Sequence, residues 1–360
     1  MKKKISTIIG TRPEIIKMYP IIKELDKNFN NQLIWSGQHY DFNMVKNIFL
    51  DLNLRKPDYF IKIKDKSKTF FEIQKKIFNI LRRNNSKAIV YHGDTFTTLA
   101  SALVSRFFFP KILNVHVEGG YRSHDITQTE EQVRFIADHI SQLNFVQRKN
   151  DRSNLDNENC QNEIKIVGNS IKDSVDAVKK TKLISSKFLK KYSLKNNNYI
   201  YCTIHRSENV DDTLRLKKII KIIRLFSKIK KIIIPIHPRA KNKFKKLNFT
   251  MSKNIIFTGP LKFSESISLL SKCYFSFTDS GGIQEEAIIL KKRSLVPLDF
   301  TPHNYYIDKN ANNLIDINSK NYLQKIEQFL KFHQKNQKIK KFNHPKNIGK
   351  KIKKIINSKL

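Results

Sequence analysis

Cysteine is scarce in this sequence, which has only three, Cys160, Cys202 and Cys273, and no Cys-x-x-Cys pair. Cysteines so far apart argue against a zinc site or a disulfide framework, and they fit a reducing compartment. No stretch approaches the ~20 apolar residues of a membrane span. The basic opening MKKK precedes an apolar run that is too short for a signal peptide. We therefore expect a cytoplasmic protein without membrane insertion.

Acidic residues are also few, since Asp and Glu total 31 against 69 Lys and Arg, a net charge of +38. Such a charge by itself suggests an anionic partner, which could be nucleic acid, a membrane surface or a phosphorylated substrate. However, lysine is spread through every segment, and the sequence lacks zinc-finger spacing, a basic zipper and an aromatic RNA-binding signature. We therefore expect no nucleic-acid partner.

The length of 360 residues exceeds the size at which a single core usually stops growing, so two domains are expected. Short apolar runs alternate with helical patterns, which predicts βαβ units and parallel sheets. We predict an α/β fold with two parallel-sheet halves and a cleft between them. The predicted boundaries are 1–175, 176–345 and a Lys-rich helix or tail at 346–360. The predicted strands cover residues 4–9, 32–35, 88–92, 114–117, 199–204, 231–236 and 274–278.

Two loops that follow predicted strands have the features of a helix N-terminus. In residues 10–14, GTRPE, a glycine turn precedes a Thr cap and an early Pro. In residues 279–286, DSGGIQEE, two glycines would let the backbone approach a ligand, and a glutamate follows one turn later. Helix N-termini favour anions, although a plain cap is an alternative at each. Because the loops lie in different halves, a nucleotide diphosphate or nucleotide-sugar that bridges the halves explains the pair better.

Residues 116–139 hold an unusual density of ionisable side chains beside paired glycines. Glu118 follows an apolar strand and precedes two glycines, a position that favours acid/base chemistry. Glu130, Arg134 and Asp138 recur on one helix face with Glu131 beside them, and a surface ion-pair face is the alternative. His205 lies at the end of a predicted strand and is weaker evidence for a catalytic site, because a single histidine is more often structural.

The ordered motifs resemble the UDP-N-acetylglucosamine 2-epimerase family. They are GTRPEIIKMYPII, SGQHYD, GDTFTTLASAL, HVEGGYRS, TEEQVRF, VGNSIKD, HRSEN, HPR and TDSGGIQEEA, within residues 4–298. The resemblance implies a GT-B architecture with the substrate between two Rossmann-like domains and a C-terminal helix that crosses back. It also implies a UDP-sugar substrate, a homodimer, and neither a cofactor nor a metal. Members invert C2 of a nucleotide-sugar by eliminating UDP, forming 2-acetamidoglucal and adding UDP back.

The same resemblance implies functional residues in this chain. Opposite-face proton transfer at C2 needs two acid/base groups, and their pKa values would have to be raised by burial or by neighbouring carboxylates. Three converging carboxylates would raise these pKa values. The implied catalytic residues are Asp94, Glu118, Glu130 and His205. The implied substrate-binding residues are Arg12, Lys17, Gln38, Ser280, Gly281, Gly282 and Glu286.

The chain also departs from the family pattern. Where the family has an arginine followed by Thr-Glu-Arg-Pro-Glu, this chain reads DFTPH at residues 299–303. The gap between Gly120 and Glu130 is shorter than in UDP-GlcNAc members, as in relatives that act on 2,3-diacetamido sugars or hydrolyse off UDP. We expect a UDP-GlcNAc 2-epimerase that supplies surface polysaccharide synthesis. Those two relatives are the alternatives, and a GT-B glycosyltransferase, which would not need the acidic residues, is a third.

Overall fold

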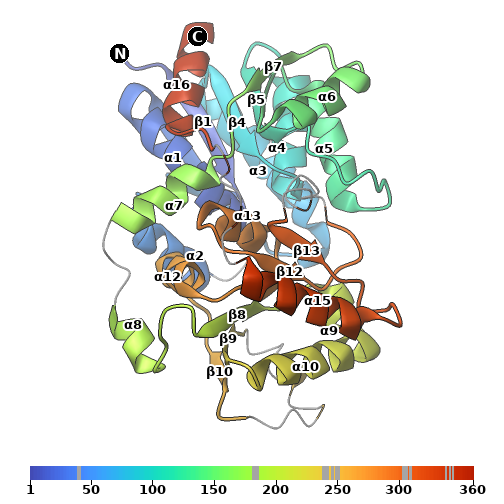
Figure 1. The fold of residues 1–360 in the computed structure, drawn as a ribbon. Helices are drawn as coiled ribbons and strands as arrows, with labels where there is room; N and C mark the ends of the chain where they lie inside the picture. The colour runs from blue at the N-terminus through green and yellow to red at the C-terminus, as the bar shows by residue number, and fades with distance from the viewer. Residues whose placement is uncertain are drawn as a thin grey trace. The chain divides into compact units, whose positions relative to one another are not determined.

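A computed structural model describes residues 1–38, 42–180, 186–236, 243–244, 247, 252–301, 307, 310–336, 339, 342 and 344–360 (Figure 1). The chain forms two compact units. The first comprises Met1–Asp176 with His344–Leu360, and the second comprises Ala177–Asn343. Among the described residues, no helix has the length and apolar character needed to cross a membrane.

The first unit contains a sheet of seven parallel strands in the order β3-β2-β1-β4-β5-β6-β7. Strands β1 and β4 are adjacent, and the chain runs outward from them in opposite directions. This is the topological switch point, where parallel α/β sheets bind their ligands. The strands are β1 Lys4–Ile9, β2 Asn30–Trp35, β3 Tyr59–Phe60, β4 Ala88–His92, β5 Leu113–Gly119, β6 Leu143–Val146 and β7 Glu163–Ile166.

Helices α3, α4 and α5 pack together, and their apolar side chains share a core with one face of this sheet. The C-terminal helix α16 packs on α1, and the two helices lie side by side in Figure 1. Contact is so close that a Cβ atom on Gly349 would lie 2.3 Å from the carbonyl oxygen of Pro20. The helices are α1 Arg12–Asn28, α2 Phe42–Asp51, α3 Thr69–Asn84, α4 Phe96–Phe108, α5 Thr129–Ile140, α6 Lys149–Asn157, α7 Ile171–Lys180 and α16 Ile348–Lys359.

The second unit repeats the plan with six parallel strands in the order β10-β9-β8-β11-β12-β13, so its switch point lies between β8 and β11. The strands are β8 Tyr199–Thr203, β9 Lys231–Pro235, β10 Ile255–Thr258, β11 Ser276–Thr278, β12 Ser294–Val296 and β13 Asn312–Leu314. The helices are α8 Ser186–Lys191, α9 Ser207–Val210, α10 Thr213–Ser227, α12 Phe263–Lys272, α13 Gly281–Ile289 and α15 Tyr322–Lys335.

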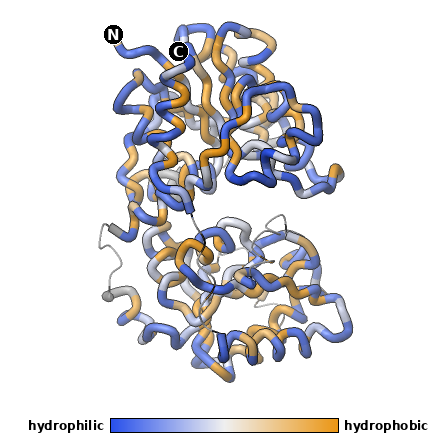
Figure 2. The backbone as a smooth tube through the Cα atoms, turned by 45° about the horizontal axis from the view of Figure 1, so that its top comes forward, coloured by the Kyte–Doolittle hydropathy of each residue, from blue (hydrophilic) through white to orange (hydrophobic). Residues whose placement is uncertain are grey.

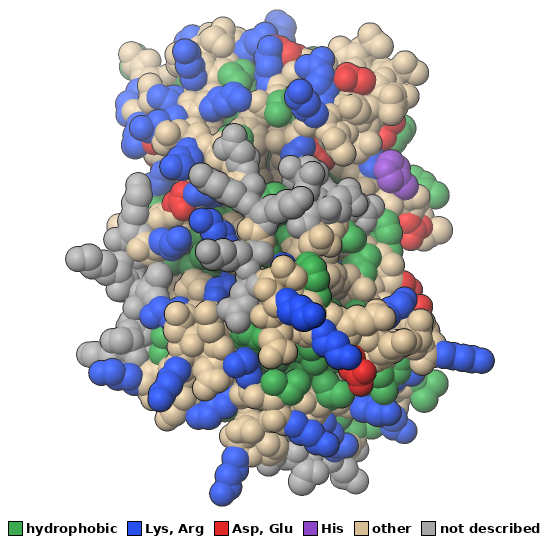
Figure 3. All heavy atoms as spheres, in the orientation of Figure 1, with side chains coloured by type: hydrophobic (Ala, Val, Ile, Leu, Met, Phe, Trp, Pro, Cys, Tyr) green, Lys and Arg blue, Asp and Glu red, His purple; other side chains and the backbone are tan. Residues whose placement is uncertain are grey.

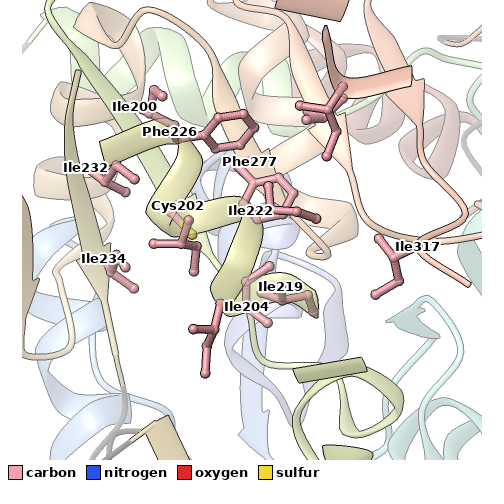
Figure 4. Close-up of a cluster of buried hydrophobic side chains, with 14 of the residues drawn as sticks. Ile200, Cys202, Ile204, Ile219, Ile222, Phe226, Ile232, Ile234, Phe277 and Ile317 are labelled. Carbon is pink, nitrogen blue, oxygen red and sulfur yellow. The ribbon is translucent and has the colours of Figure 1, made fainter. Parts of the chain in front are cut away.

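The apolar residues of the strands account for the burial of both sheets. Strand segments such as AIVYH in β4 are nearly continuous apolar runs, because a parallel sheet is covered on both faces. Figure 2 shows orange, hydrophobic stretches of backbone in both units. In the second unit, isoleucines of β8, β9 and α10 meet Phe226 and Phe277 in one core (Figure 4). The prediction of two parallel-sheet α/β units is confirmed. Lysine and arginine side chains lie scattered over the surface seen in Figure 3.

Candidate functional site

Glu118 lies at a deformed position near the end of β5. The pairing of β5 with β6 shifts register between Val117 and Gly119, and Glu118 has a positive φ of 75°. A regular strand would point Glu118 to the same face as His116, since side chains two residues apart share a face. The irregularity instead lets its carboxylate reach His92 and α1. Left-handed backbone in a non-glycine residue costs about 1–3 kcal/mol and is concentrated at functional sites.

The Glu118 carboxylate is held mainly by cations. Its Oε2 accepts hydrogen bonds from Lys17 Nζ at 2.5 Å and Gln147 Nε2 at 2.6 Å, and His92 Nε2 lies 3.5 Å away. Burial raises the pKa of Glu118, but Lys17 and His92 outweigh this and hold that pKa well below its ordinary value. The expectation of a raised pKa is therefore wrong for Glu118, because its neighbours are cations rather than carboxylates.

The predicted anion site at the start of α1 is largely filled from within the chain. The carboxylate of Glu14 accepts hydrogen bonds from the backbone N–H of Gly10, from that of Thr11 at 3.0 Å, and from Thr95 Oγ1 at 2.6 Å. Burial raises the pKa of Glu14, although these hydrogen bonds oppose the rise. The interpretation that free amides await a phosphate here is wrong for Gly10 and Thr11. Arg12, half-buried in the first turn, is the remaining phosphate candidate of this loop.

Two other predicted substrate residues have structural contacts. Lys17 is bonded to Glu118, as described above. The Oε1 of Gln38 accepts hydrogen bonds from the N–H of Thr97 at 2.9 Å and from its hydroxyl at 2.8 Å, so Gln38 caps the start of α4. Both side chains therefore help to shape the carboxyl edge of the first sheet.

Arg134 on α5 links Asp94, one of the predicted catalytic carboxylates, to Glu131. Arg134 pairs with Asp94 and, through Nη1 at 3.2 Å, with Glu131. Glu131 is buried and also accepts the backbone N–H of Ser123 at 2.8 Å. Glu130, by contrast, is exposed in the first turn of α5. The expected convergence of Asp94, Glu118 and Glu130 stays a prediction, and Arg134 lies within electrostatic reach of both Asp94 and Glu118.

The alternative of a surface ion-pair face on α5 is wrong. Asp138 is fully buried, and it accepts hydrogen bonds from Arg122 at 2.8 Å and from the N–H of Gly120 at 3.0 Å. Its other oxygen lies 2.8 Å from Nδ1 of His116. Burial raises the pKa of Asp138, but His116 and Arg122 outweigh it, and the net pKa is lowered.

This buried network ties the loop that carries Asp94 to the loop that follows Glu118. Nε2 of His116 lies 2.8 Å from the carbonyl oxygen of Gly93, next to Asp94. Sequence reasoning missed the positioning role of His116 and Arg122. Both residues lie in the ionisable stretch 116–139, which was the available signal. Only the packing of α5 on β5 distinguishes a buried network from a solvated helix face.

In the second unit, Asp279 organises the loop of His205. The buried carboxylate accepts the N–H of His205 at 3.1 Å, that of Arg206 at 3.0 Å and the Asn209 side chain at 3.0 Å. Nδ1 of His205 lies 3.3 Å from the same carboxylate, while the His205 side chain is 61% exposed. Asp279 therefore holds the His205 loop, and the cap of α13 is Ser280 rather than Asp279.

The glycine-containing loop of this unit opens α13. Ser280 is the N-cap, and its hydroxyl accepts the N–H of Ile283 at 3.5 Å. A Cβ atom on Gly282 would meet nothing closer than 3.9 Å, so there is space beside the first turn at this residue. Glu286 is buried one turn further along. These features are compatible with an anion at this helix N-terminus.

The divergent loop that begins at Asp299 receives an arginine from α10. Nη2 of Arg215 lies 3.5 Å from the carbonyl oxygen of Pro297 and 3.6 Å from Asp299, and its Nε donates to Asn209 at 3.2 Å. A cation therefore remains near this loop despite the altered sequence. The rest of the motif, Pro302 and His303, and the HPR motif at 237–239 lie outside the described residues.

Comparison with known proteins agrees with the sequence motifs. The family model described as UDP-N-acetylglucosamine 2-epimerase matches residues 23–358. The UDP-N-acetylglucosamine 2-epimerase of Methanococcus maripaludis is 37% identical over 91% of this chain and 92% of its own. The UDP-2,3-diacetamido-2,3-dideoxy-D-glucuronate 2-epimerase of Pseudomonas aeruginosa is 29% identical over 87% of this chain and 88% of its own.

A solved structure shows the same fold. The crystal structure of Methanocaldococcus jannaschii UDP-GlcNAc 2-epimerase, in complex with UDP-GlcNAc and UDP, is 34% identical, covers 99% of each chain and superposes with a TM-score of 0.87. The protein is thus an α/β enzyme of the GT-B type. It belongs to the UDP-N-acetylglucosamine 2-epimerase family, which confirms the resemblance found from the motifs.

Proposed function

We propose that this protein is a nucleotide-sugar 2-epimerase that interconverts UDP-GlcNAc and UDP-ManNAc. The observation that carries the proposal is the Glu118 carboxylate, turned inward at a β-irregularity and bonded to Lys17. A proton acceptor must be ionised before it acts, and the lowered pKa of Glu118 satisfies that condition at neutral pH. The higher identity to a UDP-GlcNAc enzyme than to the diacetamido relative supports this substrate.

The C2 proton of such a sugar is not acidic, so direct deprotonation would face a high barrier. In the proposed reaction, C2 loses its proton while UDP leaves C1, and 2-acetamidoglucal forms. Protonation of the opposite face of C2 and return of UDP then give the epimer. We assign acid/base and leaving-group roles to Asp94, Glu118, Glu130 and His205. Glu118 has the strongest structural support, because its carboxylate is desolvated and held in place by named donors.

The proposed substrate-binding residues come from both units. We propose that the N-terminus of α13, with Ser280, Gly281, Gly282 and Glu286, binds the diphosphate and ribose. Arg12 is proposed to add charge from the first unit. Lys17 and Gln38 stay in the proposed site, but through their contacts to Glu118 and α4. The domain roles, acid/base chemistry in 1–175 and nucleotide binding in 176–345 with 346–360 returning to the first domain, are part of this proposal.

The alternative is a relative that acts on a UDP-2,3-diacetamido sugar or releases free ManNAc and UDP. The altered loop at Asp299 and the short segment between Gly120 and Glu130 favour it. Both alternatives use the same chemistry at C2. They differ in the group at C3 and in whether water, rather than UDP, adds to the intermediate.

One experiment separates these outcomes. The protein is incubated with UDP-GlcNAc in heavy water, and the sugar is followed by NMR. Deuterium at C2 of recovered UDP-sugars supports the epimerase, and free ManNAc plus UDP supports the hydrolytic form. Reaction of only a UDP-2,3-diacetamido sugar supports that substrate. Absence of C2 exchange with every UDP-HexNAc tested overturns the proposal.

We further propose a cytoplasmic homodimer. The homodimer is supported by six exposed apolar side chains on helices α3, α4 and α5, because a surface rich in large apolar groups marks an interaction site. Sedimentation equilibrium should give twice the chain mass of 42.4 kDa, and a monomer at micromolar concentration would contradict it. The exposed side chains are Phe71, Phe96, Phe107, Phe108, Phe135 and Ile136.

A further inference from the structure

Two buried histidines occupy neighbouring strands of the first sheet, and they differ in their bonding. His116 on β5 has partners for both ring nitrogens, at 2.8 Å from Asp138 and 2.8 Å from the carbonyl oxygen of Gly93. His92, the last residue of β4, is 4% exposed. Among the described residues its Nδ1 has no hydrogen-bond partner, and its Nε2 lies 3.5 Å from Oε2 of Glu118. His116 is therefore explained as a structural residue, whereas His92 is not.

An incompletely bonded imidazole is unfavourable in the core. A buried polar group without its hydrogen bond costs about 1–3 kcal/mol, so an apolar residue would serve packing better at this position. The backbone of His92 is already fixed, because its carbonyl oxygen accepts the Thr98 hydroxyl at 2.6 Å. The imidazole thus contributes little to the fold that another side chain could not, and a group of this kind is a candidate for function.

The position of His92 suggests what that function is. It lies within the electrostatic reach of two carboxylates, Glu14 on α1 and Glu118 on β5. Lys17 on α1 and Arg134 on α5 place positive charge beside Glu118, and Asp151 on α6 adds a further negative charge. Of the basic groups in this set, only the imidazole has a free electron pair that can accept a proton from Glu118, since Lys17 and Arg134 have none. A distance of 3.5 Å is long for a hydrogen bond, but such contacts often tighten when substrate binds.

We propose that His92 is a positioning residue that exchanges a proton with Glu118 during the C2 reaction, an inference that rests on the proposed epimerase function. When Glu118 takes the C2 proton, the C–H electron pair forms the C1=C2 double bond. The C1–O bond breaks, and its electron pair leaves with UDP. The proton on Glu118 Oε2 passes to Nε2 of His92, which becomes imidazolium, and Glu118 returns to a carboxylate beside Lys17. The reverse transfer returns the proton from His92 to Glu118, which can then act as the acid.

The test is His92→Gln, in which an amide can still donate a hydrogen bond to Glu118 but cannot accept a proton. The kcat for deuterium exchange at C2 of UDP-GlcNAc should fall about a hundredfold, a usual contribution of one acid/base group, with little change in KM. The acid limb of the pH profile should also move to lower pH. The reason is that His92 must be neutral to take the proton from Glu118, and its protonation in acid can no longer stop exchange in the variant. Exchange within about threefold of the unaltered protein, with the same acid limb, overturns the proposal.

His116→Gln is the matched control, because it removes the other buried histidine. It breaks two hydrogen bonds, so the melting temperature should fall, while the acid limb should stay in place. An equal shift of the limb in both variants would indicate a general structural effect and overturn the proposal.

A second measurement does not depend on the folding of a His92 variant. In protein labelled with ¹⁵N-histidine, the ring signals of His92 should respond to Glu118→Gln, since the paired carboxylate is lost. Unchanged ring signals would overturn the proposal even if C2 exchange is never observed. Absence of C2 exchange in the unaltered protein would instead contradict the proposed function, so the two failures are distinguishable.

Discussion

The carboxyl edges of the two sheets use charge in different ways. In the first unit, the side chains of Glu14, Glu118 and Asp138 are buried or nearly so, and each carboxylate has several donors. In the second unit, the buried carboxylate of Asp279 holds backbone N–H groups, and the histidine beside it is exposed. Charges interact more strongly when they are removed from water. The first edge can therefore set the protonation states of its buried carboxylates, whereas the second edge can orient a histidine that remains in solvent.

The largest expected effect is loss of the proton acceptor at the first edge. Glu118→Gln keeps the shape of the side chain but cannot ionise, so we expect C2 exchange to fall on the order of 10³-fold or more. UDP binding, measured by calorimetry, should be largely intact. Exposed Glu327 on α15 offers the same chemical change as a control, and Glu327→Gln should leave exchange unaltered. Near-normal exchange in Glu118→Gln would remove Glu118 from the mechanism.

The second prediction concerns the network that supports that edge. Asp138→Asn breaks a fully buried charge pair with Arg122, and we expect a loss of about 3 kcal/mol in the free energy of unfolding. The folded-state pKa of Asp138 is lowered, so its contribution is present above the unfolded pKa of about 3.9 and is lost as pH falls through the folded pKa. Urea unfolding should therefore separate the variant from the unaltered protein at pH 7 and bring them together in acid.

The control for this prediction is Asp156→Asn, which removes a half-exposed carboxylate that pairs with Arg152. A surface pair of this kind contributes about 0–1 kcal/mol. If Asp138→Asn were no more destabilising than this control, the buried network would not support the first edge.

The third prediction separates the paired glutamates of α5. Glu130 is exposed, so Glu130→Gln should lower C2 exchange about a hundredfold with little loss of stability if it acts on the substrate. Glu131→Gln removes an acceptor of the Ser123 and His124 N–H groups and should destabilise the protein by about 1–3 kcal/mol. Thermal melts and exchange rates measure the two effects. The reverse pattern would assign the acid/base role to Glu131.

The smallest effect is expected at the second edge. The backbone N–H groups of His205 and Arg206 donate to the Asp279 carboxylate. In Asp279→Asn the amide N–H₂ group faces these donors and cannot accept from them. The His205 loop should therefore shift, while the imidazole itself is retained. We expect C2 exchange to fall about 10- to 100-fold, as misplaced groups commonly do, and less than in His205→Asn. Time-course NMR assays measure the C2 exchange rate of both variants. A greater loss in Asp279→Asn than in His205→Asn would mean that Asp279 does more than orient the histidine.

Several elements were predictable because they depend on local pattern. The mostly apolar runs at 4–9 and 88–92 are β1 and β4 with the predicted bounds, since a strand covered on both faces is rich in apolar residues. The family could also be identified, because its motifs occur in order along one chain. The actual partners of Glu118 were not predictable, since Lys17 and Gln147 lie far from it in sequence.

By itself, the sequence determined the two α/β halves, the family and the candidate residues, because periodicity, strand-end loops and motif order are properties of the linear chain. Only the tertiary structure decided how each residue is used. It buried Asp138, left Glu130 exposed, and turned Glu118 toward Lys17 and His92. The physical reason is that the protonation and bonding of a side chain depend on its distance to charges and its access to water, and these depend on packing between distant segments.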